Sequence, residues 1–184
     1  DRSGQVVSVL GPIKPHTLGH TLMHEHLFID FWLPLDEPER WQKLGGDAKP
    51  PSSSKELHIW NMPFNARNRT KLIPYFFRNR DAFTLDNIET ALNEVRSFQE
   101  LGGKTIVDVT SIGLNRQPQK LYEVAKKTGV NIVMGTGFYR RAWHPNELND
   151  YSLDDLTTLM VREIVEGLEN TEIKAGIIGE IPAE

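Results

Sequence analysis

The residues best suited to chemistry in this sequence are two histidines that are one residue apart. His24 and His26 flank Glu25 inside the largely apolar run 21–31. Side chains alternate in direction along a strand, so a strand here would point both imidazoles one way and Glu25 the other. Two neutral imidazoles directed at one point can bind a divalent cation such as Zn²⁺. The structural alternative is a pair of core histidines in a buried strand, each with its own hydrogen-bond partner.

Glu180 is the second candidate, because it lies near the carboxyl end of a predicted strand over residues 175–181. In a β/α barrel the carboxyl ends of the strands collect the catalytic groups, so Glu180 and the histidine pair would open on the same rim. A carboxylate in that position could bridge two cations about 3.5 to 4 Å apart. The alternative is an ordinary acidic residue in a surface loop.

Helix and strand patterns alternate from residue 84 onward. Helices are predicted over residues 84–101 with Thr84 as N-cap, from Pro118 to Gly129, and from Ser152 with Asp155 completing a capping box; strands are predicted over residues 105–110, 131–135 and 175–181. This alternation is typical of parallel β/α units, in either a barrel or a doubly wound sheet. No glycine-rich phosphate loop follows any of these strands, which disfavours a nucleotide-binding sheet.

The segment 32–83 has a different character, with six prolines and many aromatic residues. A connection of that length is unusual in a compact domain. Short helices are predicted over residues 37–44 and 66–79, and the aromatic content argues against disorder. The segment could be a lid or pocket wall, or equally a packed insertion or subunit interface.

The composition is that of an ordinary globular protein. The chain has 184 residues, of which 39% are hydrophobic and 25% charged, enough for one sizeable core. A net charge of −4 with scattered basic residues gives no reason to expect nucleic acid as a partner. No apolar stretch approaches the roughly 18 residues that span a membrane, and residues 1–4 do not resemble a signal peptide. A cytoplasmic location is therefore expected, with a cleaved leader left open. The absence of cysteine leaves histidine and carboxylates as the strong metal ligands.

Five ordered motifs carry a resemblance to a known family. They read GPI at 11–13, LGHTLMHEHL at 18–27, IVDVT at 106–110, VMGTGFY at 133–139 and KAGIIGEI at 174–181. Together they resemble the phosphotriesterase family of the amidohydrolase superfamily, especially its phosphotriesterase-related members, from about Gly4 to the end of the chain.

The resemblance implies a (β/α)₈ barrel with a binuclear metal centre, Zn²⁺ being the expected ion. His24 and His26 would bind the more buried ion. Glu180 would be the bridging ligand in place of the carboxylated lysine of the best-known members, since Lys174 lies too early in its motif. Phe138 and Tyr139 would line the substrate pocket, followed by Arg140, Arg141, Trp143 and His144 in the same loop.

The resemblance further implies that a bridging hydroxide hydrolyses an ester, lactone or phosphotriester. Two further metal-binding histidines and an aspartate expected by the family do not occur within these residues, and a complete barrel needs about 250 residues. Residues 1–184 are therefore interpreted as the amino-terminal half of one barrel domain, comprising four β/α units with an insertion at 32–83. Apart from the metal ligands, no catalytic residue is assigned within them.

Two alternatives to this function remain. The same site could hydrolyse an N-acyl amide, or the chain could be a non-catalytic binding or assembly subunit that retains the fold. Asp108, Asn115 and Arg116 also fall on the rim side, where they could support the metal ligands or be purely structural. The expected partner is a small-molecule substrate, and homo-oligomerisation is left open.

Overall fold

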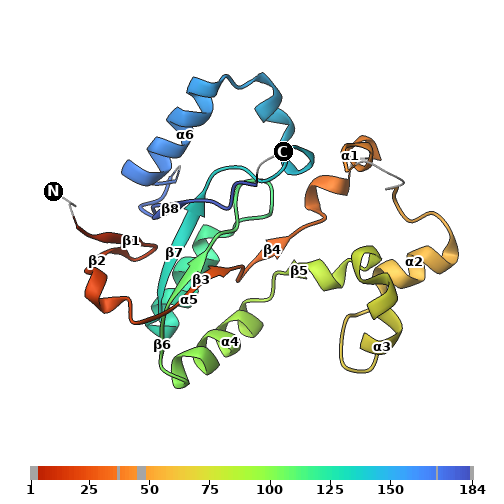
Figure 1. Cartoon of the computed structure of the whole chain (residues 1–184), viewed down its shortest axis with the longest axis horizontal. Helices are drawn as coiled ribbons and strands as arrows, with labels where there is room; N and C mark the ends of the chain where they lie inside the picture. The colour runs from red at the N-terminus through yellow and green to blue at the C-terminus, as the bar shows by residue number, and fades with distance from the viewer. Residues whose placement is uncertain (1–3, 37, 45–48, 169, 183–184) are drawn as a thin grey trace.

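Four parallel strands form the central sheet of the molecule (Figure 1). The computed structural model describes residues 4–36, 38–44, 49–168 and 170–182. The strands lie in the order β3 (His20–Glu25), β6 (Gly103–Asp108), β7 (Asn131–Thr136) and β8 (Ile177–Ile178). Each follows its predecessor through a connection that contains a helix, and the sheet curls into half of a barrel. The predicted first four β/α units of a barrel are thereby confirmed.

Three amphipathic helices cover the sheet: α4 (Ile88–Glu100), α5 (Pro118–Thr128) and α6 (Leu153–Val165). The end of α5 is as predicted, with Gly129 in the left-handed conformation at φ 74°. The capping box of Ser152 and Asp155 is also present at the start of α6. The prediction that Thr84 caps α4 was wrong: the Asn87 side chain accepts from the Thr90 amide at 3.0 Å, while Thr84 belongs to a strand.

Buried apolar side chains lie on both faces of the sheet, because successive residues of a strand point to opposite faces. One face carries Ile106, Ile132 and Met134, which cluster with apolar residues of α4 and α5. The other face carries Val107 and Val133 in a separate cluster. A hairpin of β1 (Val6–Ser8) and β2 (Gly11–Ile13) packs at the amino-terminal end of the strands, followed by the short helix η1 (Pro15–Thr17).

The first and last strands are less regular than the sequence predicted. A buried strand was predicted for the histidine pair; within the described residues β3 has β6 as its one neighbouring strand, and Met23 is 64% exposed. The last strand, β8, is two residues long, although a strand was predicted over residues 175–181. Beyond Ile178, the amide of Glu180 bonds to the Val109 carbonyl instead of continuing a ladder with β7.

The insertion is closed at its base by two short strands. β4 (Ile29–Asp30) pairs antiparallel with β5 (Thr84–Leu85), so the chain leaves and returns at one place. Between them lie η2 (Leu33–Asp36), α1 (Pro38–Lys43), α2 (Ser54–Asn61), α3 (Arg69–Leu72), η3 (Ile73–Arg78) and η4 (Asp81–Phe83). Helices occur in both predicted regions, 37–44 and 66–79, although Glu37 lies outside the described residues. Helix α2 was not predicted, despite its readable capping box of Ser53 and Glu56.

The insertion has its own aromatic core. Trp32, Leu35 and Trp41 are buried together, with Trp60 and Phe83 packed against them. The Trp41 indole donates to the Leu35 carbonyl at 2.6 Å. These contacts support a packed insertion, whereas a role as a lid or subunit interface stays a prediction.

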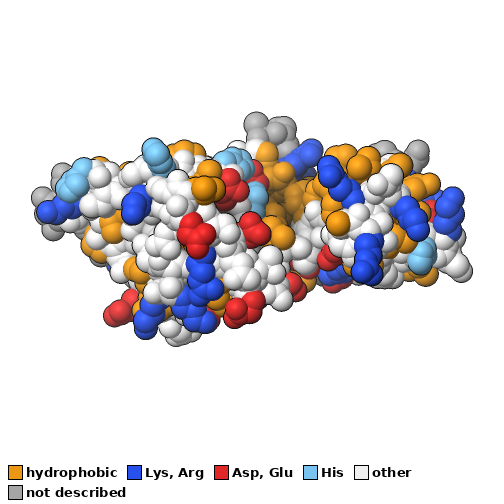
Figure 2. Space-filling view, turned by 90° about the horizontal axis from the view of Figure 1, so that it is seen from below, with side chains coloured by type: hydrophobic (Ala, Val, Ile, Leu, Met, Phe, Trp, Pro, Cys, Tyr) orange, Lys and Arg blue, Asp and Glu red, His pale blue; other side chains and the backbone are white. Residues whose placement is uncertain are grey.

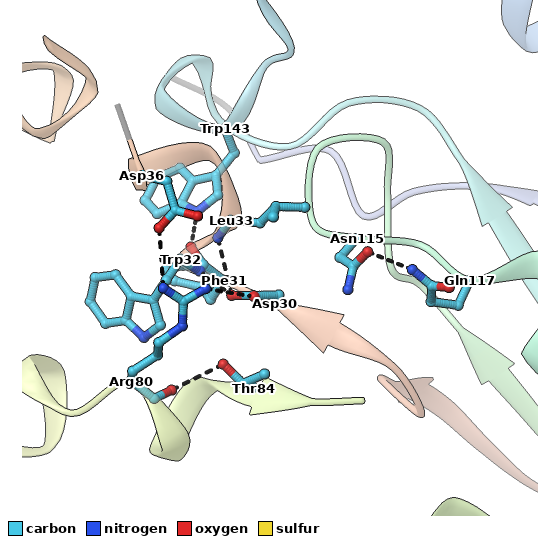
Figure 3. Close-up of polar contacts among 10 residues, drawn as sticks. All are labelled: Asp30, Phe31, Trp32, Leu33, Asp36, Arg80, Thr84, Asn115, Gln117 and Trp143. Atoms are coloured by element: carbon cyan, nitrogen blue, oxygen red, sulfur yellow. Dashed lines mark hydrogen bonds and ion pairs between the residues drawn. The ribbon is translucent and has the colours of Figure 1, made fainter. Parts of the chain in front are cut away.

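Arg80, near the C-terminal end of the insertion, forms ion pairs with residues at its N-terminal end (Figure 3). Its guanidinium lies 3.2 Å from the Asp30 carboxylate and 3.1 Å from that of Asp36. The other oxygen of Asp30 accepts from the amides of Trp32 and Leu33 at 2.9 and 3.0 Å. These ion pairs raise the pKa of Arg80 against the opposing effect of its partial burial. The Asp30 carboxylate therefore holds both the turn that follows β4 and the segment that leads into β5.

Candidate metal centre

The structure brings the three predicted metal ligands together. His24 Nε2 lies 3.0 Å from Glu180 Oε2, and His26 Nε2 lies 3.6 Å from Glu180 Oε1. Candidate ligand atoms of the three residues all lie within 4.8 Å of one another. No other such group of three or more occurs in the described part of the chain.

Both histidines lie at the carboxyl end of β3, but only His24 is within the strand; His26 follows it directly. The pairing of β3 with β6 shifts register between Leu22 and Glu25, immediately around the pair. The two rings meet edge to face with centroids 5.7 Å apart. Within the described residues, the His24 side chain is 61% exposed and that of His26 is 24% exposed.

Val109, just after β6, links the two halves of the site through its backbone. Its amide donates to the carbonyl of Glu25 at 3.0 Å, and its carbonyl accepts from the amide of Glu180 at 2.9 Å. Glu25 is the residue between the two histidines. One peptide segment therefore sets the separation between the imidazoles and the carboxylate.

Asp108 supports the same region from below the surface. It is fully buried, and its carboxylate accepts from the amides of Leu27 at 2.8 Å and Thr110 at 3.0 Å. Burial raises the pKa of Asp108, while these hydrogen bonds act in the opposite direction. With both oxygens directed at backbone amides, Asp108 joins the ends of β3 and β6 and does not face the ligand group.

The donor set fits a first-row divalent cation. Metal–ligand bonds of about 2.0 to 2.2 Å in a tetrahedral arrangement place neighbouring donor atoms about 3.3 to 3.6 Å apart. Of the two separations between imidazole nitrogen and carboxylate oxygen, 3.6 Å lies at the upper end of that range and 3.0 Å slightly below it. Two imidazoles and one carboxylate are also ligands that Zn²⁺ accepts.

The two predicted pocket residues differ in exposure. Phe138 is buried at 8% exposure, and its ring meets that of His144. Tyr139 is partly buried, and its ring packs on Phe31 and Trp143. Burial raises the pKa of Tyr139, and the charge of the Glu180 carboxylate raises it further.

Figure 2 shows a recess lined by hydrophobic side chains between the barrel part and the insertion, with histidine and acidic side chains at its edge. At this junction Phe31, Tyr139 and Trp143 pack with Leu114 and Ala142. The Trp143 indole donates to the Phe31 carbonyl at 2.6 Å, and Arg40 donates to the His144 carbonyl at 2.5 Å. The loop after β7, including η5 (Arg141–Trp143) and η6 (Asn146–Asp150), is thereby held against the base of the insertion.

Arg116 is a structural residue. Its guanidinium forms a bidentate ion pair with Glu163 of α6 at 2.7 and 2.8 Å and donates to the Gly135 carbonyl at 2.9 Å. Both side chains are less than a tenth exposed, and the Thr136 hydroxyl also donates to Glu163. Asn115 adopts a positive φ of 63° and accepts from the Gln117 side chain. The sequence analysis missed Glu163 because it lies within an otherwise ordinary helical pattern.

Half of a parallel β/α barrel, with two histidines and a carboxylate converging beyond the carboxyl ends of its strands, defines a β/α-barrel protein with a candidate metal centre. The phosphotriesterase family model matches residues 4–184. The chain therefore belongs to the phosphotriesterase family, as its motifs indicated.

Known proteins agree with this assignment. The chain is 38% identical over 180 residues to the N-acetyltaurine hydrolase of Xenopus tropicalis, covering 97% of this chain and 48% of that protein. It is similar to the crystal structure of a resiniferatoxin-binding protein from Rhodobacter sphaeroides, with TM-score 0.81, 35% identity, and coverage of 97% of this chain and 46% of the other. A lactonase from Listeria monocytogenes matches with TM-score 0.61 and 26% identity, over 95% of this chain and 46% of the other.

The chain spans about half the length of the curated relatives it matches. None of the described helices has the length and hydropathy of a membrane-spanning segment.

Proposed function

We propose that the complete protein containing this chain is a metal-dependent hydrolase with a binuclear centre. The observation that carries the proposal is the convergence of His24, His26 and Glu180 at the rim of a phosphotriesterase-family barrel. When bound, divalent ions at this rim would lower the pKa of a shared water and polarise the bond under attack.

The residues of this chain have distinct roles in the proposal. His24 and His26 hold one ion through Nε2, the nitrogen of each ring that faces the carboxylate. Glu180 offers two oxygens and can therefore serve as the bridging ligand, with Zn²⁺ as the expected metal. Tyr139 forms part of the substrate-pocket wall, and the proton acceptor is expected outside these residues.

The relatives support two substrate classes to different degrees. A relative named for hydrolysis of N-acetyltaurine shares 38% of its residues with this chain over the matched length, whereas a structural neighbour named as a lactonase shares 26%. An N-acyl amide is therefore the first substrate class to test, followed by lactones, esters and phosphotriesters. Fold alone does not choose among them, because the pocket selects the substrate.

Metal analysis of the complete protein tests the proposal. We expect bound zinc in the wild type and a loss of zinc and of hydrolysis in His24→Ala and in His26→Ala. His58→Ala is the matched control, since His58 is an exposed histidine on α2 of the insertion. Unchanged zinc content and unchanged hydrolysis in both site variants would overturn the proposal.

A substrate panel then separates the classes. An N-acyl amino-sulfonate, a γ-lactone, an aryl ester and a phosphotriester should be compared by kcat/KM with the same zinc-loaded protein. If the wild type is stable and free of metal, and hydrolyses none of them, the alternative of a non-catalytic binding or assembly subunit is favoured instead.

A further inference from the structure

The buried hydroxyl of Thr110 lies against the ring of His26. The two atoms in contact are Thr110 Oγ1 and His26 Nδ1, at 2.9 Å. Thr110 is fully buried, and the same hydroxyl donates to the carbonyl oxygen of Phe28 at 3.2 Å. His26 therefore meets the end of β6 through one ring nitrogen and Glu180 through the other.

Counting protons defines the two directions in which the contact to His26 can run. A threonine hydroxyl has one proton and can donate once. When that proton goes to the Phe28 carbonyl, Oγ1 can only accept from His26, so the imidazole proton is on Nδ1. The opposite orientation would leave the Phe28 carbonyl without this bond and put the imidazole proton on Nε2, the atom that faces Glu180.

The backbone around Thr110 is held in place for this contact. Asp108 accepts from the Thr110 amide through one oxygen and from the Leu27 amide through the other. Leu27 is the residue after His26. The buried carboxylate thus fixes the main chain beside both the hydroxyl and the imidazole, and neither partner can move away independently.

We propose that Thr110 is a positioning residue of the metal centre: its hydroxyl accepts the Nδ1 proton of His26 and so keeps the Nε2 lone pair directed at the cation. The inference rests on the proposed function, because it requires that His26 is a ligand. The other ring nitrogen of a metal-binding histidine usually donates to such a partner, and losing that partner weakens metal binding about 10- to 100-fold.

Zinc affinity of the complete protein, measured by competition with a chromophoric chelator, tests this role. Thr110→Val keeps the shape of the side chain but removes the hydroxyl, and we expect its dissociation constant for zinc to rise about 10- to 100-fold. Thr110→Ser retains the hydroxyl and should remain within about threefold of the wild type. A serine variant as weak as the valine variant would contradict the proposal.

Thr105→Val provides the matched control. Thr105 is also fully buried, lies in β6, two residues beyond whose end Thr110 stands, and donates to the Leu18 carbonyl at 2.7 Å. Its replacement removes an equivalent hydroxyl away from the ligands, so stability should fall while zinc affinity is unchanged. An equal loss of zinc affinity in both valine variants would reduce the role of Thr110 to general stability.

The protonation of His26 can also be measured in the wild-type protein, so that this test needs no variant. Long-range ¹H–¹⁵N spectra of the zinc-loaded wild type should show His26 protonated at Nδ1 and bound through Nε2. Binding through Nδ1 would overturn the role of Thr110 even if zinc is held tightly. A wild type that binds no zinc would instead refute the metal centre itself, so the two failures are distinguishable.

Discussion

The backbone amide of Glu180 donates to the carbonyl oxygen of Val109 at 2.9 Å. Because the Val109 amide also bonds to Glu25, the carboxylate is held relative to the histidine pair by main-chain hydrogen bonds that do not depend on side-chain identity. The candidate ligands are thus placed by the fold before any cation binds. This arrangement reduces the reorganisation that metal binding requires.

Glu180→Gln should sharply weaken metal binding. The amide keeps the size of the side chain but removes the negative charge and one acceptor oxygen. Because losing only an outer partner of a ligand weakens binding by about 10- to 100-fold, we expect loss of Glu180 itself to exceed that range. Zinc titration checks this, with Glu147→Gln, an exposed glutamate in η6, as control. Equal affinity of the two variants would remove Glu180 from the site.

Gly135→Ala should displace the segment that carries Glu180. A Cβ at Gly135 would lie 2.2 Å from the carbonyl oxygen of Gly179, which is backbone and cannot swing away. We expect a loss of stability of about 1–3 kcal/mol and a zinc affinity at least about tenfold lower.

Gly176→Ala is the comparison for that variant. Its Cβ would lie 2.1 Å from the carbonyl oxygen of Val7 in the hairpin at the opposite end of the strands. The stability of Gly176→Ala should fall to a similar extent, but the zinc affinity of its folded molecules should be unchanged. Urea unfolding combined with zinc titration separates the two effects.

Breaking the buried ion pair between Arg116 and Glu163 should destabilise the fold strongly. Removing one partner leaves an uncompensated charge, and we expect Arg116→Met to cost about 3–5 kcal/mol in urea unfolding. The double variant Arg116→Met with Glu163→Leu should recover part of that loss. Lys127→Ala, which breaks an exposed pair with Glu123, should change stability by less than about 1 kcal/mol. Comparable losses for the buried and exposed pairs would contradict this interpretation.

Glu56 should make the insertion sensitive to acid. Hydrogen bonds from the Ser53 and Ser52 amides lower the pKa of Glu56 from 4.5 to about 2 in the folded protein. Because the unfolded chain binds this proton more readily, the stabilisation is present above pH 4.5 and is lost as the pH falls toward 2.

Carboxyl chemical shifts of Glu56 measured against pH check the lowered pKa. Glu56→Gln should be less stable than the wild type at pH 7, and the two proteins should be about equally stable near pH 2. Glu94→Gln, on the exposed face of α4, should not reduce the stability at pH 7. A titration midpoint near 4.5 for Glu56 would refute the capping contribution.

Tyr139 and Phe138 should respond differently to truncation. Tyr139→Ala removes a partly exposed ring of the proposed pocket wall, so we expect KM to rise about tenfold with zinc content unchanged. Phe138→Ala removes a buried ring and should cost about 3–5 kcal/mol of stability. Steady-state kinetics and thermal unfolding of both variants distinguish a pocket wall from a core contact.

The three helices that cover the sheet and the two inner strands could be predicted from the sequence, apart from the start of α4, because periodicity and end signals are local properties. Pro118 and Gly129 mark the ends of α5, and Ser152 with Asp155 marks the start of α6. The start of α4 was misplaced from the same kind of signal, since Thr84 is drawn into the strand pairing with Asp30 and leaves Asn87 as the cap. That pairing closes the long insertion and has no local signature.

The assembly of the candidate site could not be predicted from local sequence, because it depends on contacts between distant segments. The motifs named His24, His26 and Glu180 as ligands, but the contact between residues so far apart in sequence depends on Val109, which no spacing singles out. The same holds for Thr110 beside His26 and for Glu163 beside Arg116. Each of these contacts joins separate β/α units, and hydrogen bonds of this kind are set by the curvature of the sheet, not by the residues adjacent in the chain.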